Sequence, residues 1–509
     1  MINPITRTDY PDPDVIRVGN TFYMVSTTMY FFPGGDILRS YDLVHWEIAA
    51  HIFDLIDGTD AEHLQNGENA YGKGMWAASL RYHDGKFYVL FVSHGQKDTH
   101  LYTADTIEGP WEHKRIKGYF HDASLLFDDD GRVFLTSGNM QIRLTELNED
   151  LSGPKPGGID RVIIKDDPEK VFLGYEGSHF YKINGRYYIT LIHWPKDIAR
   201  RTEAVFVSDH VSGPYVGRDV CSDDMGYHGQ GVAQGGLVDT PDGQWFSIMF
   251  RDSGAIGRVP VLVPVKMDGE FPEFGENGII PECFETPDLN PGYRYEPLFA
   301  SDDFTFFGEA RPKLKPQWQW NHIPDASNMR IAPEGGLAIT TGRTDVNLVH
   351  AKNVITQRMC YPVCAGEVTV DASGIREGDY AGLCVHQGCY GMIAVTKTEK
   401  GYELVRIGKT EPVKGFGIGS NDNEPGVITD RTLLMGPVVR LRIDADFSDM
   451  ADTARFSYEK DGAFVPLGAV HKLAFRLDHF TGARFGLAYF ATKQAGGTAV
   501  FRKFRYLFD

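Results

Sequence analysis

The stretch YPDPDVIRVGNTFY (residues 10–23) contains the two signals that decide the fold. An apolar strand follows the prolines, breaks at a Gly-Asn turn and resumes with aromatic residues, which is the pattern of a β-hairpin. Ahead of that hairpin, Asp12 stands between two prolines, which stiffen the backbone on either side of it. Asp-Pro pairs are also common in surface turns, so the interpretation depends on whether the pattern recurs downstream.

The hairpin pattern recurs four more times in the first half of the chain. Each copy has an Asp-Gly or Asn-Gly turn ahead of an aromatic-rich strand, at residues 84–85, 130–131, 184–185 and 242–243. Five hairpin units at intervals of roughly 45–65 residues predict an all-β fold, namely a five-bladed β-propeller. A β-sandwich with unusually regular hairpins is the alternative.

A polar or aromatic side chain precedes each turn at a similar distance. Trp76, Asp122 and Glu176 each lie nine positions before the glycine of their turn. Asp12 and His228 precede their turns by seven and fifteen positions. Because the first strand of each propeller blade lines the central channel, we expect these five side chains to converge at one end of that channel. Burying three acids together is costly unless they are paired or used.

The hairpin repeat stops at the stretch DLNPGYRYEP (residues 288–297). Alternating strands then continue to the C-terminus, for example at residues 438–444 and 499–506. We therefore divide the chain into a propeller domain at residues 1–297 and a C-terminal β-sandwich, of jelly-roll or concanavalin-like type, at residues 298–509.

Composition narrows the class of partner. A formal net charge of -18 argues against nucleic acid and anionic membranes, and no apolar run is long enough to span a bilayer. Aromatic residues make up 12% of the chain, which suits a sugar or another flat neutral ligand. The N-terminal residues lack the regions of a signal peptide, so we expect a cytoplasmic protein, or a periplasmic or secreted one if a leader was removed. The sequence leaves open whether the chain forms a homo-oligomer.

The three acids Asp12, Asp122 and Glu176 are the residue types that glycoside hydrolysis needs. One carboxyl group must be protonated to help the leaving oxygen depart, and another must be charged to activate water or attack carbon. A third carboxylate beside the acid would raise the pKa of that acid by like-charge repulsion. The residues alone therefore favour a glycosidase.

Taken together, the motifs resemble family 43 of the glycoside hydrolases, whose catalytic domain is a five-bladed propeller. The matching segments are PDPDVIRVG (11–19), GMWAAS (74–79, with Ala78 in place of the family's proline), DASL (122–125) and EGSHFYK (176–182). The segments QWQWNH (317–322) and YFATK (489–493) resemble those of members with a C-terminal β-sandwich, so the resemblance covers essentially the whole chain.

The resemblance implies an inverting mechanism. Asp12 would be the general base, Glu176 the general acid, and Asp122 the group that tunes and orients the acid. By the same route, substrate contacts are expected from Trp76, Phe31, Phe32, His228, Gln230 and Arg258. A core role for Trp76, His228 and the two phenylalanines, and a solvated Arg258, are the alternatives.

The resemblance also bears on metals. His228 resembles a channel histidine that in some members contacts a central calcium ion or its waters. We therefore expect that no cofactor is required for the chemistry, and we keep a structural calcium in the propeller channel as an option.

The expected substrate is an arabinose- or xylose-containing oligosaccharide or polysaccharide. We favour an exo-acting enzyme that releases terminal α-L-arabinofuranose from plant cell-wall material, with a β-D-xylosidase, or a bifunctional enzyme, as the alternative. The long loop at residues 51–74 and the appended sandwich would block an extended cleft, which disfavours an endo-arabinanase. The motifs of fructan-cleaving propellers are missing, and the presence of all three acids disfavours a propeller that only binds glycans.

Overall fold

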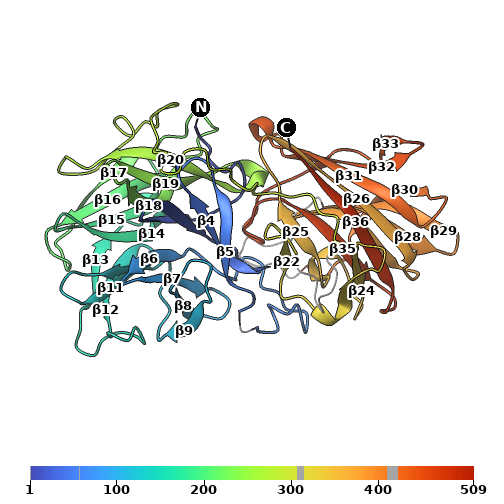
Figure 1. The fold of residues 1–509 in the computed structure, drawn as a ribbon, viewed down its shortest axis with the longest axis horizontal. Coiled ribbons are helices and arrows are strands. Elements are labelled where there is room, and N and C mark those ends of the chain that lie inside the picture. The colour runs from blue at the N-terminus through green and yellow to red at the C-terminus, as the bar shows by residue number, and fades with distance from the viewer. Residues whose placement is uncertain (1, 57, 306–313, 410–421, 509) are drawn as a thin grey trace.

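The computed structural model describes residues 2–56, 58–305, 314–409 and 422–508. Figure 1 shows two β-rich halves side by side, the N-terminal one blue to green and the C-terminal one yellow to red. The N-terminal half contains five four-stranded sheets, and the C-terminal half contains two larger sheets. The chain is therefore an all-β protein in which a five-bladed propeller is followed by a β-sandwich, as predicted.

Within each blade the strands are ordered as they occur along the chain. Blade 1 contains β1 (Asp14–Val18), β2 (Thr21–Ser26), β4 (Gly34–Ser40) and β5 (Glu47–Phe53). Blade 2 contains β6 (Ser79–His83), β7 (Lys86–Ser93), β8 (Asp98–Ala104) and β9 (Glu112–Ile116). Blade 3 contains β10 (Ser124–Phe127), β11 (Val133–Ser137), β12 (Gln141–Leu147) and β13 (Asp160–Lys165). Blade 4 contains β14 (Val171–Ile183), β15 (Arg186–Pro195), β16 (Thr202–Ser208) and β17 (Val216–Cys221). Blade 5 contains β18 (Ala233–Asp239), β19 (Trp245–Asp252), β20 (Arg258–Lys266) and β21 (Glu273–Phe274).

The hairpin turns have the backbone conformation that their sequences predict. Asn184 and Gly185 both have positive φ, and Ile183 pairs with Arg186 across this two-residue turn. Two positive φ angles define a type I′ turn, whose twist matches that of the flanking strands, and Asn-Gly adopts it at low cost. The turns at 130–131 and 242–243 differ, because they lie in longer connections between Phe127 and Val133 and between Asp239 and Trp245.

The first strands of the blades close into a ring. β1 contacts β6, β6 contacts β10, β10 contacts β14, β14 contacts β18, and β18 returns to β1. These five strands therefore line the central channel, as they do in other propellers. Side chains placed at the start of each strand are brought to one end of the ring.

The two sheets of the sandwich form the C-terminal half. The first sheet runs in the order β3 (Phe31–Phe32), β22 (Gln319–Asn321), β25 (Ile355–Arg358), β35 (Arg484–Ala491), β27 (Asp379–His386), β28 (Gly391–Thr398), β29 (Gly401–Gly408) and β30 (Val427–Leu433). The second runs in the order β23 (Met329–Ile331), β24 (Leu337–Thr340), β36 (Thr498–Phe508), β26 (Val363–Gly374), β31 (Val438–Asp446), β32 (Thr453–Lys460) and β33 (Ala463–Pro466), and β34 (His471–Lys472) also pairs with β32. Four short 3-10 helices are η1 (Gly254–Ile256), η2 (Ala326–Asn328), η3 (Leu348–His350) and η4 (Ser448–Met450).

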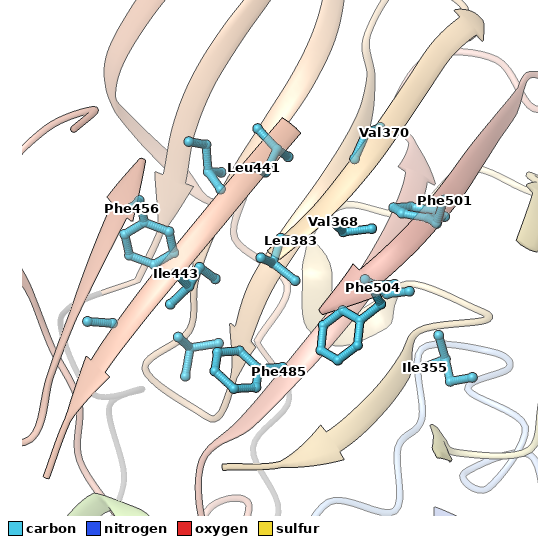
Figure 2. Packing of buried hydrophobic residues seen from close by; sticks show 14 of the residues in the cluster. Ile355, Val368, Val370, Leu383, Leu441, Ile443, Phe456, Phe485, Phe501 and Phe504 are labelled. Carbon is cyan, nitrogen blue, oxygen red and sulfur yellow. The ribbon is translucent and has the colours of Figure 1, made fainter. Parts of the chain in front are cut away.

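Alternating strand residues build the core between these two sheets. Along β31, Leu441 and Ile443 are buried while their neighbours are partly exposed, which is the period of a strand with one face in a core. Figure 2 shows these side chains close to Leu383 of β27 and Phe485 of β35, which belong to the facing sheet. The sandwich thus has an apolar core of its own.

One strand crosses between the halves. β3 lies in sequence within the first blade, yet Phe32 pairs with Trp320 and Phe31 pairs with Asn321 of β22 in the sandwich sheet. The boundary placed at residues 297 and 298 falls in the segment between β21 and β22, where the described residues form no regular strand. The exchange of β3 ties the two halves together. Within the described ranges, no helix has the length and apolar character needed to span a lipid bilayer.

Candidate active site

Four of the predicted site residues, Asp12, Trp76, Asp122 and Glu176, lie at or near the start of an innermost strand. β1 starts two residues after Asp12, β6 starts three residues after Trp76, and β10 starts two residues after Asp122. Glu176 lies within β14, whose first residues precede it. We call this end of the propeller the site face.

Asp12 is held rigidly at the site face. It is buried and has a φ of 52°, in the left-handed region that few residues other than glycine adopt. The Arg258 guanidinium donates to its Oδ1 at 2.6 Å, and Thr27 Oγ1 donates to its Oδ2 at 3.0 Å. Both carboxylate oxygens are therefore oriented by neighbours, and the backbone strain is of the kind found at functional sites.

Asp122 and Glu176 meet at His121. The His121 Nε2 atom lies 3.5 Å from Asp122 Oδ2 and 3.4 Å from Glu176 Oε2. Asn139, at the start of the connection to β12, donates its side-chain amide to the same Glu176 oxygen. The other oxygen of Asp122, Oδ1, is buried without a hydrogen-bond partner among the described residues. We call Asp122, Glu176, His121 and Asn139 the acid cluster.

The pKa values of the residues in the acid cluster are shifted in different directions. Burial, together with the charges of Glu176 and Asp12, raises the pKa of Asp122 to about 7 against the opposing charge of His121. Burial would also raise the pKa of Glu176, but the hydrogen bonds and charge of His121 and the amide of Asn139 outweigh it, so the pKa is lowered. Burial disfavours the charged form of His121, yet the two carboxylates raise its pKa to about 9.

This distribution differs from the expectation that a third carboxylate raises the pKa of Glu176. The rise falls on Asp122 instead, because His121 and Asn139 stabilise the ionised form of Glu176. His121 was not singled out from the sequence, although it directly precedes Asp122. The raised pKa values thus fall on Asp122 and His121, and His121 contacts both Asp122 and Glu176.

Trp76 and Arg258 lie beside these acids. The Trp76 ring meets the His121 ring edge to face at 5.5 Å, and it stacks on His94 at 4.4 Å. Arg258 is buried and paired with Asp12, so it is not the solvated arginine of the alternative interpretation. A third ring comes from the sandwich, because Phe480 lies 4.7 Å from the Arg258 guanidinium and 5.9 Å from the Trp76 ring.

Asp9 explains how a residue of the sandwich reaches the site. The Asp9 carboxylate accepts hydrogen bonds from the backbone N–H groups of Arg258 in blade 5 and Gly482 in the sandwich. Gly482 follows Phe480 by two residues, so a single buried carboxylate holds both sides of the contact. Sequence patterns gave no signal for Phe480, since the contact joins residues of different domains.

Phe31 and Phe32 do not line a sugar pocket. Their exposed fractions are 0% and 1%, and both rings belong to apolar clusters. Phe31 packs against the Arg484 guanidinium at 3.6 Å, and Phe32 packs against Phe53 at 6.1 Å. The expectation of substrate contact is therefore wrong for both, and the physical reason is the exchange of β3 into the sandwich sheet.

His228 and Gln230 are not brought to the acids either. They lie in the connection between β17 and β18, and His228 Nε2 is 2.6 Å from Asp449 of η4. Gln230 donates weakly to the backbone carbonyl of His228 at 3.4 Å. The expected channel position of His228 is wrong, because this loop turns toward the sandwich.

Charged side chains of the innermost strands form an ion network in the channel. The Arg81 guanidinium occupies the channel, where it donates to Asp14 at 2.6 Å and to the backbone carbonyls of Leu125 and Phe180. His179 contacts the other oxygen of Asp14 at 3.1 Å. Burial opposes ionisation of Asp14, but the charges of Arg81 and His179 prevail and lower its pKa to about 2. Asp14 is thus paired with side-chain cations, and a structural calcium ion in the channel stays a prediction.

The site contains two carboxyl groups, Asp12 and Glu176, in different environments. Asp12 is oriented by Arg258 and Thr27, while Glu176 belongs to the acid cluster. The charges of both carboxylates raise the pKa of Asp122. Such a division suits cleavage of a bond between sugars, which needs one group to accept a proton and one to donate it. On a five-bladed propeller it places the protein among the glycoside hydrolases.

Comparison with known proteins gives the family. The family model described as glycosyl hydrolases family 43 matches residues 1–272, and the model described as beta xylosidase C-terminal concanavalin A-like domain matches residues 301–507. The chain belongs to glycosyl hydrolase family 43.

Individual relatives are similar in sequence to this chain over more than half of its length. A solved structure described as a bifunctional GH43-CE protein of Bacteroides eggerthii is 39% identical with a TM-score of 0.90, and the match covers 99% of this chain but only 63% of that longer one. A beta-xylosidase of Formosa agariphila is 25% identical over 100% of this chain and 90% of its own. A non-reducing end alpha-L-arabinofuranosidase of Bacteroides ovatus is 30% identical over 59% of this chain and 58% of its own.

Proposed function

We propose that this protein is an exo-acting, inverting β-D-xylosidase that removes single xylose residues from the non-reducing ends of xylo-oligosaccharides. We choose xylose as the substrate sugar because most relatives of this chain are named as xylosidases. The beta-xylosidase of Formosa agariphila matches the full length of this chain, and xylosidase recurs in the names of relatives from Vibrio and Bacillus subtilis. This reverses the order of preference that the motifs alone suggested.

An α-L-arabinofuranosidase is the second proposal. It is favoured by the Bacteroides ovatus relative and by the relatives named xylosidase/arabinosidase from Humicola insolens and Butyrivibrio fibrisolvens. An enzyme that accepts both sugars would satisfy the same observations.

The proposed reaction uses the two acids on opposite sides of the bond. Asp12 takes a proton from a water molecule as its oxygen attacks the anomeric carbon, and Glu176 gives a proton to the departing glycosidic oxygen. The attack inverts the anomeric configuration because it comes from the face opposite the leaving group. His121 would then hold the carboxyl group of Glu176 and pass it its next proton, because His121 contacts both Glu176 and Asp122.

Two features support exo action. Phe480 of the sandwich lies against Arg258 and Trp76 and so covers part of the site face. The connection between β5 and β6 packs on the sandwich, where Ala70 N–H donates to His322 and Tyr71 donates to the Val349 carbonyl. A long polysaccharide would have to displace these contacts to pass through.

A panel of aryl glycosides tests the choice of sugar. We expect kcat/KM for 4-nitrophenyl β-D-xylopyranoside to exceed that for 4-nitrophenyl α-L-arabinofuranoside by about tenfold or more, since a fitted sugar pocket discriminates by a few kcal/mol. The opposite ratio would replace the first proposal by the second. Xylotetraose should release xylose from the start, and early xylobiose without xylose would argue against exo action.

A further inference from the structure

The first strand of blade 4 extends further beyond the site face than the first strands of blades 1 and 3. β1 and β10 begin only after Asp12 and Asp122, but β14 begins at Val171, five residues before Glu176. The extra length pairs with the end of β15, where Leu173 lies opposite Trp194. A strand rises by about 3.3 Å per residue, so this part of the hairpin projects up to roughly 16 Å beyond Glu176.

Two aromatic side chains lie on this projection. Phe172 is 64% exposed, which makes it one of the most exposed large apolar residues among those described. Trp194 is half-buried beside it, and the two rings meet edge to face at 5.9 Å. A single exposed apolar residue is ordinary on a protein surface, but an exposed aromatic pair indicates a binding surface.

A series of contacts between charged side chains connects this aromatic pair to the active site. The Arg201 guanidinium lies 5.8 Å from the Trp194 ring centroid and donates to Asp252 at 2.6 Å. Asp252 in turn lies 3.4 Å from Arg258, the partner of Asp12. The charge of Arg201 also acts on Glu176. Glu176 lies on the same β14–β15 hairpin as the aromatic pair, so the pair lies on the Glu176 side of the site and is connected to the site through Arg201 and Asp252.

The geometry points to a leaving-group subsite, in which Phe172 and Trp194 bind the pyranose rings that follow the bond to be cleaved. This inference rests on the proposed function, in which Glu176 protonates the leaving oxygen, so the departing oligosaccharide emerges on the Glu176 side. The C–H faces of a pyranose are apolar and flat enough to pack on an aromatic ring, which gives large contact area at little entropic cost. The occupant is thus a xylo-oligosaccharide rather than its terminal sugar.

Phe172→Ala tests the subsite with two substrates that differ only in their leaving group. Xylotriose presents two sugars to Phe172, whereas β-D-xylopyranosyl fluoride presents a fluoride ion that cannot reach it. We expect kcat/KM for xylotriose to fall about three- to tenfold, mainly through KM. A loss of this size corresponds to the binding free energy of one aromatic packing contact. Turnover of the fluoride should stay unchanged, and Phe172→Tyr should restore xylotriose cleavage.

Tyr82→Ala is the matched control. Tyr82 is another exposed aromatic residue, 43% exposed, but it lies near the far end of β6. Unchanged xylotriose kinetics in Phe172→Ala, or an equal fall for both substrates, would overturn the subsite while leaving the proposed function intact. A wild-type enzyme that hydrolyses neither substrate would overturn both.

Discussion

Glu176→Gln is expected to lower kcat on xylobiose by a factor of about 10²–10⁴, because it removes the group that protonates the leaving oxygen. The amide has nearly the shape of the carboxyl group and can still accept a hydrogen bond from His121 or Asn139. Substrate binding should therefore survive, with KM close to that of the wild type. Steady-state kinetics on xylobiose measure both constants.

The leaving group separates this role from a structural one. Fluoride departs without full protonation, so Glu176→Gln should retain far more activity on β-D-xylopyranosyl fluoride than on xylobiose. Glu203→Gln is a matched control on the same blade, since burial raises the pKa of Glu203 to about 8 and the substitution should change its charge little at pH 7. Equal turnover of xylobiose by Glu176→Gln and wild type would remove Glu176 from the mechanism.

Asp12→Ala is expected to lower kcat by a similar factor of about 10²–10⁴ on both substrates. Water must be activated whatever the leaving group, so the fluoride should not rescue this variant. The contrast between the two variants is the diagnostic result. A variant of Asp12 that hydrolyses the fluoride at the wild-type rate would show that another group is the base.

The buried partner of Asp12 needs a separate control. In Asp12→Ala, Arg258 loses its 2.6 Å ion pair and keeps only the longer contact with Asp252 at 3.4 Å, and breaking a buried pair costs up to about 3–5 kcal/mol of stability. Asp12→Asn keeps one oxygen that can accept from Arg258, and its amide N–H can donate to the Thr27 hydroxyl, so this variant should unfold closer to the wild-type temperature. Loss of activity in Asp12→Asn with a retained melting transition would assign the effect to chemistry rather than to folding.

Much of the architecture could be predicted because its causes are local. Asn184-Gly185 and the other turns determine where strands reverse, and the period of the hairpins determines the number of blades. Asp12, Asp122 and Glu176 could be proposed as neighbours because each occupies a similar position relative to a turn. The structure places the three acids in one electrostatic cluster.

The remaining features depend on contacts between distant parts of the chain. Phe31 and Phe32 follow the first blade in sequence, but pairing with β22 takes them into the sandwich. Phe480 reaches the site only because Asp9 binds the backbone of Gly482. His228 pairs with Asp449, a residue of the other domain. No local pattern encodes such pairings, because each of them joins residues of two different domains.

The most direct test of the account is the configuration of the sugar first released. Proton NMR of the early time course on xylobiose distinguishes the two anomers of xylose before they interconvert. If Asp12 activates water on the face opposite the bond that Glu176 protonates, α-D-xylose appears first from the β-linked substrate. Release of β-D-xylose as the first product would mean retention, and would contradict the roles given to Asp12 and Glu176.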